Sequence, residues 1–304
     1  MDLRSTLAAC ALVATALHAG TAAADSLYAT AGAPGSVTYL YGIAPDTGLT
    51  DSGRFLASGG IAFTGATTGL AYGDGSLYMT AGAVGSASYL YAFQPGPAAG
   101  DGGRAIGDGS RLFTGATTGL AFGNGDLYMT AGSVGSASYL FDIDPATALI
   151  RGSTPIVDDG HLFIGATTGL AFGDGVVYMT AGDVGSATWL YGIDPATGHV
   201  VSSRPLVVEG RYFTGAVTGL AFGGGDLYVA AGAVGSAYDL YAFDPATGVS
   251  DSSHLVTDGQ RVFTGAITGL AYVPAVPEPG TFALMALGGL VAFTRRRVVR
   301  SRAA

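Results

Sequence analysis

The chain is 304 residues long, carries a net charge of −9, and is 49% hydrophobic with only 12% charged residues. Its 51 glycines follow no Gly-X-Y period and aromatic residues make up 10%, which argues against both a collagen-like and a disordered chain. Residues 25–280 hold 21 acidic side chains against 7 arginines, and because an acidic surface repels phosphate backbones, we expect no nucleic-acid partner.

Residues 1–24 have the features of a secretory signal peptide. Arg4 supplies the positive start, an apolar run follows at 7–19, and the alanines at 22–24 are the small residues that signal peptidase accepts. Cys10 is the single cysteine of the chain, so the mature body has no disulfide and no thiolate ligand. The stretch ending in Cys10 also resembles a lipobox, but too few residues precede it for the usual signal architecture.

A 50-residue repeat organises the rest of the chain. A Gly-Leu pair and a tyrosine each recur five times at this constant spacing. The pairs begin at Gly69, Gly119, Gly169, Gly219 and Gly269, and the tyrosines are Tyr28, Tyr78, Tyr128, Tyr178 and Tyr228. Internal repeats of this size indicate a propeller or a solenoid, so the repeat takes precedence over chain length in predicting the architecture.

Each repeat contains four predicted strands. A short apolar strand, Thr-Gly-Leu-Ala-Phe or Tyr, is followed by Gly-Asp-Gly or Gly-Asn-Gly, as at 173–175, which supplies the positive φ of a tight hairpin. A second strand such as 126–130, a third such as 138–143 and an Asp-Pro-Ala-Thr turn such as 144–147 come next. A more variable fourth strand, clearest at 200–208, ends the unit. No stretch of the body has the apolar period of a helix.

The two ends of the body complement each other. It opens on a second strand around Tyr28 with no first strand before it, and it closes on a first strand at 268–272 with no second strand after it. A ring of sheets avoids open edges when its ends share one sheet, whereas an open solenoid needs capping repeats instead. Four strands in about 50 residues is the size of a propeller blade. The sequence therefore predicts an all-β fold, a five-bladed β-propeller over residues 25–272 whose termini share one blade.

The residue pattern of the repeat also resembles bacterial NHL-like and YVTN-like propeller repeats. The strings that carry the resemblance are TGLAF, LY and LYGIDPATG, and they span the whole body. The resemblance implies a propeller but no particular ligand, because such repeats occur with many partners.

The sequence of the body contains no catalytic constellation, and we expect a protein that is not an enzyme and holds no cofactor or metal. Its three histidines, His161, His199 and His254, occupy different repeat positions and lack a metal-ligand spacing. Each Gly-Asp-Gly turn offers one carboxylate, and the fourth copy has Gly224 in its place, so turn geometry explains these residues without calcium.

One repeated position is a candidate for ligand binding. It follows the loop Ala-Gly-x-x-Gly-Ser and is aromatic in four repeats, while the fifth has Asp239 beside Tyr238. The four residues are Tyr39, Tyr89, Tyr139 and Trp189. Aromatic faces suit sugar rings, and multivalency would raise a weak affinity. The interpretation that their small and apolar neighbours favour is that these aromatics pack between blades.

Residues 273–304 form a tail with three parts in order. The parts are Pro277, Glu278 and Pro279, then an apolar run at 281–294, then Arg295, Arg296 and Arg297. The run predicts a short hydrophobic helix, but its 14 residues fall short of the roughly 20 that a stable membrane span needs. The arginines would hold the C-terminal end in the cytoplasm. The pattern indicates a transient stop-transfer segment.

The order of these three parts resembles the PEP-CTERM (VPEP) sorting signal, over about residues 276–297. The resemblance implies an exported protein of a Gram-negative bacterium, which an exosortase-like sorting enzyme processes after a transient stay in the inner membrane. The alternative is a plain C-terminal membrane anchor with one transmembrane helix.

Together these features predict an exported propeller of the cell surface, cell envelope or extracellular matrix that acts as a structural or binding module. The alternative is a surface lectin with repeated weak glycan sites, whose partner would be a polysaccharide. A lytic enzyme on the propeller scaffold is a third possibility.

Overall fold

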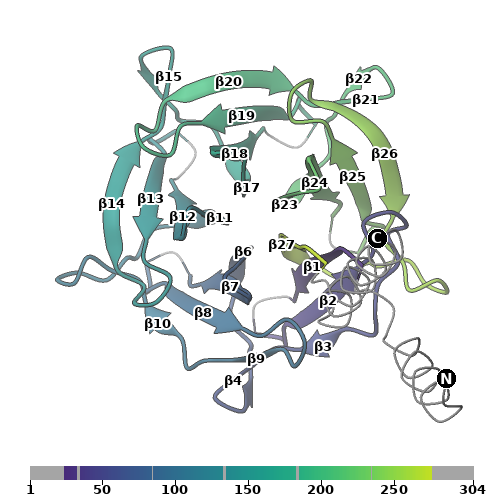
Figure 1. Cartoon of the computed structure of the whole chain (residues 1–304), viewed down its shortest axis with the longest axis horizontal. Coiled ribbons are helices and arrows are strands. Elements are labelled where there is room, and N and C mark those ends of the chain that lie inside the picture. Colours follow the sequence, from purple (N-terminus) through teal and green to yellow (C-terminus); the bar gives the residue numbers. More distant parts are fainter. Residues whose placement is uncertain are drawn as a thin grey trace, which may run out of the picture. The chain divides into compact units, whose positions relative to one another are not determined.

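The computed structural model describes residues 24–32, 35–83, 85–132, 135–182, 185–233 and 235–275. These residues form strands and turns without a helix, and five blades of antiparallel strands stand around a common axis (Figure 1). The prediction of an all-β, five-bladed β-propeller is confirmed. The chain divides into two compact units, of which Ser26–Val273 contains every strand of the described residues and the other combines Met1–Asp25 with Pro274–Ala304. Nearly all of the predicted signal peptide and the whole of the predicted tail helix lie outside the described residues.

In each blade the first strand lies at the axis and the fourth at the rim (Figure 1). The first strands are β27 (Ile267–Val273), β6 (Thr67–Gly73), β11 (Thr117–Gly123), β17 (Thr167–Gly173) and β23 (Val217–Gly223). The second strands are β1 (Ser26–Ala31), β7 (Ser76–Ala81), β12 (Asp126–Ala131), β18 (Val176–Ala181) and β24 (Asp226–Ala231). The third strands are β2 (Tyr39–Ile43), β8 (Tyr89–Phe93), β13 (Tyr139–Ile143), β19 (Trp189–Ile193) and β25 (Asp239–Phe243). The rim strands are β3 (Arg54–Phe55), β9 (Ala99–Gly100) with β10 (Arg104–Ala105), β14 (Ile150–Pro155), β20 (Val200–Pro205) and β26 (Val249–Leu255).

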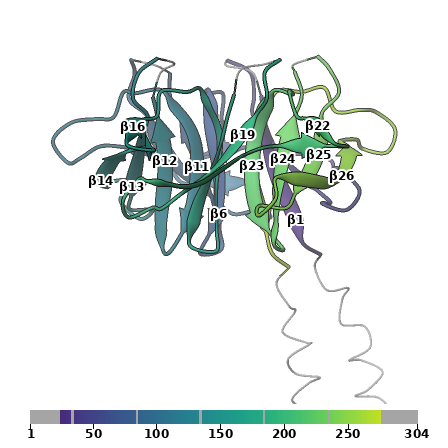
Figure 2. The same ribbon diagram turned by 90° about the horizontal axis from the view of Figure 1, so that it is seen from above.

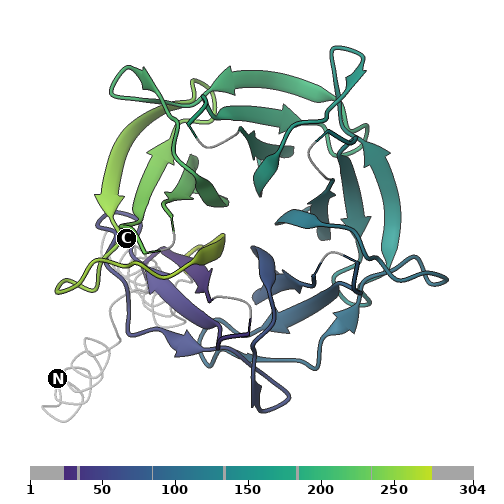
Figure 3. The same cartoon turned by 180° about the vertical axis from the view of Figure 1, so that it is seen from behind.

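The first blade is assembled from both ends of the body, as the offset of the repeats predicts. Strand β27 pairs antiparallel with β1, from Ser26 opposite Val273 to Thr30 opposite Gly269. Figure 3 shows the last strand, in yellow-green, seated beside the first ones, in purple. Because Ser26 and Val273 are paired, the ring-forming chain begins and ends on the same side of the ring, as Figure 2 also shows.

The repeated Gly-Leu pair packs the first strands against one another at the axis. A Cβ added to Gly119 would stand 2.7 Å from the Cβ and 2.9 Å from the main-chain nitrogen of Leu170 in the next blade. The same relation holds in every blade and closes with Gly269 against Leu70. A side chain at this position would push on neighbouring backbone, so the glycines set how closely the five strands approach.

We expect Gly119→Ala to destabilise the body by about 1–3 kcal/mol, the usual cost of overpacking, because its methyl group meets main-chain atoms that cannot move aside. The matched control is Gly152→Ala on β14, where an added Cβ meets nothing within 4 Å. Urea unfolding of the two variants measures the difference. Equal unfolding midpoints would contradict close packing at the axis.

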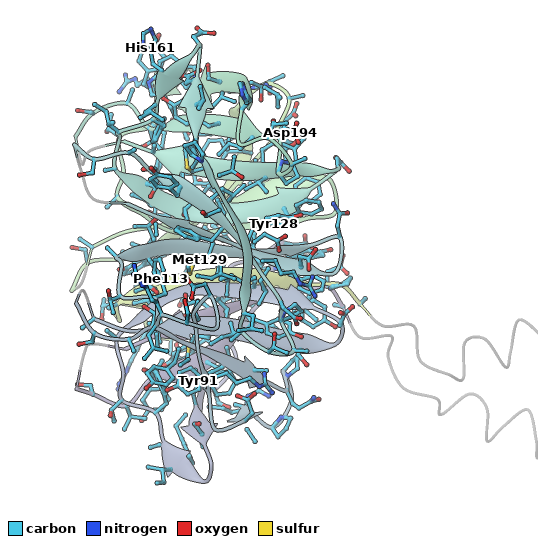
Figure 4. All side chains as sticks on the ribbon, turned by 90° about the vertical axis from the view of Figure 1, so that its left-hand side faces the viewer. Tyr91, Phe113, Tyr128, Met129, His161 and Asp194 are labelled. Carbon is cyan, nitrogen blue, oxygen red and sulfur yellow. The ribbon has the colours of Figure 1, made fainter. Side chains whose placement is uncertain are left out.

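The walls between blades are built from aromatic and aliphatic side chains of adjacent sheets. The tyrosine of a second strand stacks on the aromatic residue of the next first strand, as Tyr128 does on Phe172 with ring centroids 5.7 Å apart. Met129, beside Tyr128, is fully buried, and Figure 4 shows both within the wall of the ring. Each hydrophobic cluster therefore takes residues from two blades, which ties neighbouring sheets together.

Between each rim strand and the next first strand, the chain makes a short excursion that we call a corner. The five corners are residues 57–62, 107–112, 157–162, 207–212 and 257–262. Three of them form two-stranded hairpins, which were not predicted. These hairpins are β4 (Ala57–Ser58) with β5 (Ile61–Ala62), β15 (Val157–Asp158) with β16 (His161–Leu162), and β21 (Val207–Val208) with β22 (Arg211–Tyr212). The strand predicted at 200–208 is therefore two strands, separated at the buried Leu206.

Candidate functional site

The four candidate aromatics are all exposed to solvent. They open the third strand of their blades, with exposed fractions of 42% for Tyr39, 39% for Tyr89, 39% for Tyr139 and 41% for Trp189. Side chains alternate along a strand, and the leucine that follows each aromatic takes the buried position. Each of these aromatics therefore has an exposed face, which packing between blades alone does not require. In the fifth blade Tyr238 is the buried residue, at 1% exposure, and Asp239 takes the outer position.

Close to each exposed position, aromatic rings pack across the boundary between two blades, and we call each such boundary a groove. In the first blade the ring of Tyr39 lies 6.2 Å from that of Tyr41, and Tyr41 meets Phe263 edge-on at 5.0 Å. Phe263 follows the corner of the fifth blade. The same edge-on pair recurs between all blades, at 5.0 or 5.1 Å, as Tyr91 with Phe63, Phe141 with Phe113, Tyr191 with Phe163 and Tyr241 with Phe213. Figure 4 marks Tyr91 and Phe113 as members of this set.

The tyrosines in the middle of these grooves remain protonated hydroxyl groups at neutral pH. Burial is the main cause that raises the pKa of Tyr41, Tyr91, Tyr191 and Tyr241 above the ordinary value. Each can therefore donate or accept a hydrogen bond beside its aromatic face.

The corners place basic side chains near the grooves. One corner position holds Arg111, His161, Arg211 and Arg261, all exposed, and Ile61 in the first blade. Other arginines of the body are engaged: Arg54, Arg104 and Arg151 form ion pairs, and Arg204 donates to the carbonyls of Pro245 and Ala246. Among the described residues, no carboxylate lies within ion-pairing distance of the three corner arginines. The corners therefore present free guanidinium groups.

The axis of the ring is too narrow for an organic ligand. Two small spaces lie along it, of about 40 and 10 Å³. The larger is lined by leucine, alanine and aromatic side chains of the first strands, and the smaller by their threonines and glycines. Threonine hydroxyls bond one another there, such as Thr118 with Thr130 at 3.1 Å. The smaller space has room for about one water molecule and the larger for a few.

The histidines of the body do not come together. His161 lies on the exposed hairpin of the third corner, at the periphery of the ring (Figure 4), and His199 is exposed after a turn. Across the described parts of the chain, no three residues of the types His, Cys, Asp and Glu are grouped so as to hold a metal ion. Within those same parts, no helix has the length and apolar character to cross a membrane.

The predicted sorting residues are Pro277, Glu278, Pro279, Arg295, Arg296 and Arg297, and they lie outside the described residues. Sequence comparison decides their nature, because residues 275–298 match the PEP-CTERM protein-sorting motif. The chain carries a PEP-CTERM sorting signal. This confirms the resemblance seen at 276–297, and the signal implies processing by an exosortase-like enzyme and sorting to the cell surface.

Apart from the PEP-CTERM segment, the comparisons concern the propeller. The glutaminyl cyclase of Myxococcus xanthus is 18% identical, with 69% of this chain and 90% of that chain covered and a TM-score of 0.46. A nidogen/laminin complex gives 12% identity, coverage of 82% and 98%, and a TM-score of 0.44. The Dos1 propeller gives 16%, coverage of 76% and 57%, and a TM-score of 0.41. No curated protein matches the sequence. Likeness at this level carries no argument about function.

Proposed function

We propose that the protein is an exported, non-catalytic binding module that holds polysaccharide at the surface of a Gram-negative cell. The observation that supports the proposal is the exposure of Tyr39, Tyr89, Tyr139 and Trp189 at one repeat position around the ring. A purely structural propeller has no need of large aromatic side chains at exposed positions of its repeat. A polysaccharide-binding protein does need them, because each sugar ring has an apolar face that can pack against an aromatic ring.

The neighbours of these aromatics support the same function. Trp189 lies directly opposite Pro205 on the rim strand, and Tyr39 lies opposite the exposed Phe55. Residues opposite each other on antiparallel strands have side chains about 5 Å apart, so each aromatic extends a small apolar surface. Several such surfaces on one rigid ring would engage a repeating polymer together. Avidity then makes weak individual contacts sufficient.

The PEP-CTERM segment supports a route to this location. In the proposed route, a signal peptide at residues 1–24 directs export and is removed. The apolar run at 281–294 stays transiently in the inner membrane, held by Arg295–Arg297. An exosortase-like enzyme then releases the propeller near Pro277–Pro279 to the cell surface or the extracellular matrix.

We expect Trp189→Ala to weaken retention of the protein by polysaccharide several-fold, and substitution of all four aromatics by Ala to abolish it. Affinity electrophoresis through gels that contain dextran, galactomannan or alginate measures the retention. Because the four side chains are exposed, the melting temperature should change little in either case. The matched control is Tyr212→Ala, which removes an aromatic with 67% exposure from a corner hairpin. If the fourfold variant is retained like the parent, the aromatics are not the binding surface.

A further inference from the structure

The groove between the fifth and first blades differs from the others because two departures from the repeat meet there. The first departure is a kink in the rim strand of the first blade, which is a strand only at Arg54–Phe55. Asp51 makes the kink: its Oδ1 accepts hydrogen bonds from the N–H groups of Gly42 at 2.9 Å and Gly53 at 3.1 Å. Its Oδ2 pairs with Arg54 at 2.6 Å. Both oxygens of Asp51 are therefore engaged in holding the main chain.

The second departure is at the fifth corner, a turn closed by the bridge between Thr257 and Val262 and capped by Asp258. Asp258 Oδ1 accepts hydrogen bonds from the N–H groups of Gln260 at 2.8 Å and Arg261 at 2.6 Å. The Thr257 hydroxyl donates to the carbonyl of Arg261 at 2.8 Å.

Two other boundaries between blades have only one of these departures each. Comparison with them shows why both departures are needed for the groove. The rim strand of the second blade is kinked in the same way at Asp101, but the first corner is a hairpin that covers the kink, with Ser58 donating to the Asp101 carbonyl. The second corner is capped by Asp108 as the fifth is by Asp258, but the rim strand that it faces is continuous. The cavity beside that corner is about 230 Å³ and has no aromatic side chain in its lining.

The groove between the fifth and first blades has a volume of about 420 Å³, within the range of ligand-binding clefts. Its aromatic wall is Tyr41, and its polar groups include the Thr50 and Ser52 hydroxyls, the Asp258 carboxylate and the Arg261 guanidinium. Main-chain N–H groups of Arg261 and Gln260 are the chief cause that lowers the pKa of Asp258, so this group is an acceptor at neutral pH. Arg261 supplies donors that no carboxylate of the described residues occupies.

This set of groups selects among ligand classes. Both oxygens of Asp51 are used, which leaves one carboxylate and too few ligands for a metal ion. Asp51 and Asp258 together oppose an anionic group, and a purely apolar ligand would leave the hydroxyls, the carboxylate and the guanidinium without partners. A neutral ring with several hydroxyl groups can use the aromatic wall, the acceptors and the donors at the same time.

We propose that this groove binds one neutral hexopyranose unit, with the sugar ring against Tyr41 and its hydroxyl groups on Asp258 and Arg261. The proposal rests on the proposed function and deepens it, since it gives the ring one specific saccharide site beside the repeated, weaker aromatic surfaces. The site exists once per chain because the two departures coincide at one boundary.

The test is isothermal titration of the full protein, as recovered from the exported fraction, with glucose, galactose and mannose. We expect one of these hexoses to bind with a stoichiometry of one per chain. Arg261→Ala and Asp258→Asn should each weaken binding about tenfold or more, since each removes a charged hydrogen-bonding partner. Asp258→Asn keeps an oxygen that caps the turn, so it separates the loss of charge from the loss of the turn. The control is Arg111→Ala, which changes the equivalent corner position beside the cavity that lacks an aromatic wall and should leave the affinity unchanged.

The outcomes separate the two proposals. Hexose binding that survives both groove variants, or that falls equally in Arg111→Ala, would overturn the groove site. So would a preference for glucuronate over the neutral hexoses, or the absence of any hexose binding in a protein that polysaccharide still retains. If hexose binding depends on Arg261 but the fourfold aromatic variant keeps full retention by polysaccharide, the groove site stands and the aromatic surface does not.

Discussion

Removal of Thr268–Tyr272 is expected to prevent the body from forming a stable ring. These residues are most of β27, which supplies the axial strand of the first blade and pairs with β1. Leu270 and Ala271 are at most 3% exposed and belong to two different hydrophobic clusters. The deletion removes these buried side chains, leaves a cavity and exposes the edge of β1. Together these effects should lower the free energy of unfolding by an amount comparable to the 5–15 kcal/mol that stabilises a typical domain. Thermal unfolding and gel filtration measure the result.

The control for this deletion is a chain that ends after Ala275, which lacks the tail but keeps β27 complete. It should melt as the full-length body does, whereas the chain without Thr268–Tyr272 should aggregate or lose its cooperative transition. A deletion variant with the melting temperature of the control would show that the ring is not held closed by β27.

Replacement of Pro277, Glu278 and Pro279 by Ala is expected to stop processing of the tail. These residues are the hinge of the PEP-CTERM signal, and without them the full-length chain should accumulate in the inner-membrane fraction. In the parent, mass spectrometry of the surface or secreted fraction should find a chain that begins at Asp25 and lacks Arg295–Ala304. The effect should be close to all-or-none, because processing and release depend on a single recognition step.

The matched control is Pro274→Ala, since this proline precedes the sequence that matches the motif and should be dispensable for processing. Mature surface protein that still carries Arg295–Ala304 would count against processing and leave the alternative of a simple membrane anchor. Normal release of the triple variant would show that recognition does not use the Pro-Glu-Pro sequence.

The architecture could be predicted because it depends on features that repeat. Constant spacing of Gly119 and its four counterparts gives the number of blades, and the crowding at the axis explains why each of them is glycine. The incomplete repeats at the two ends of the body predicted that the ring closes there, because an edge strand without a partner is unfavourable. Neither inference needed knowledge of a side-chain contact.

The candidate sites could not be predicted in the same way, since they depend on which side of a strand a residue occupies. Tyr39 and Leu40 are both apolar in sequence, and only the register of β2 makes one exposed and the other buried. The groove at Tyr41 depends on the coincidence of Asp51 and Asp258 at one blade boundary, and each of them recurs in other copies of the repeat as an ordinary turn-forming residue. A search for residues that break the repeat at both sides of one blade boundary would have pointed to them.

The pairing of β1 with β27 also determines when the exported chain can fold. Strand β1, which begins at Ser26, cannot pair with β27 until Val273 has been exported. A chain that crosses the membrane from its N-terminus therefore keeps an open ring until nearly all of the body has emerged. Contacts between such distant parts of a sequence form slowly. The sorting motif begins at residue 275, only two positions after β27 ends. On the proposed export route, we expect the last strand to become available only as the sorting segment enters the membrane, so that the ring closes at the end of translocation.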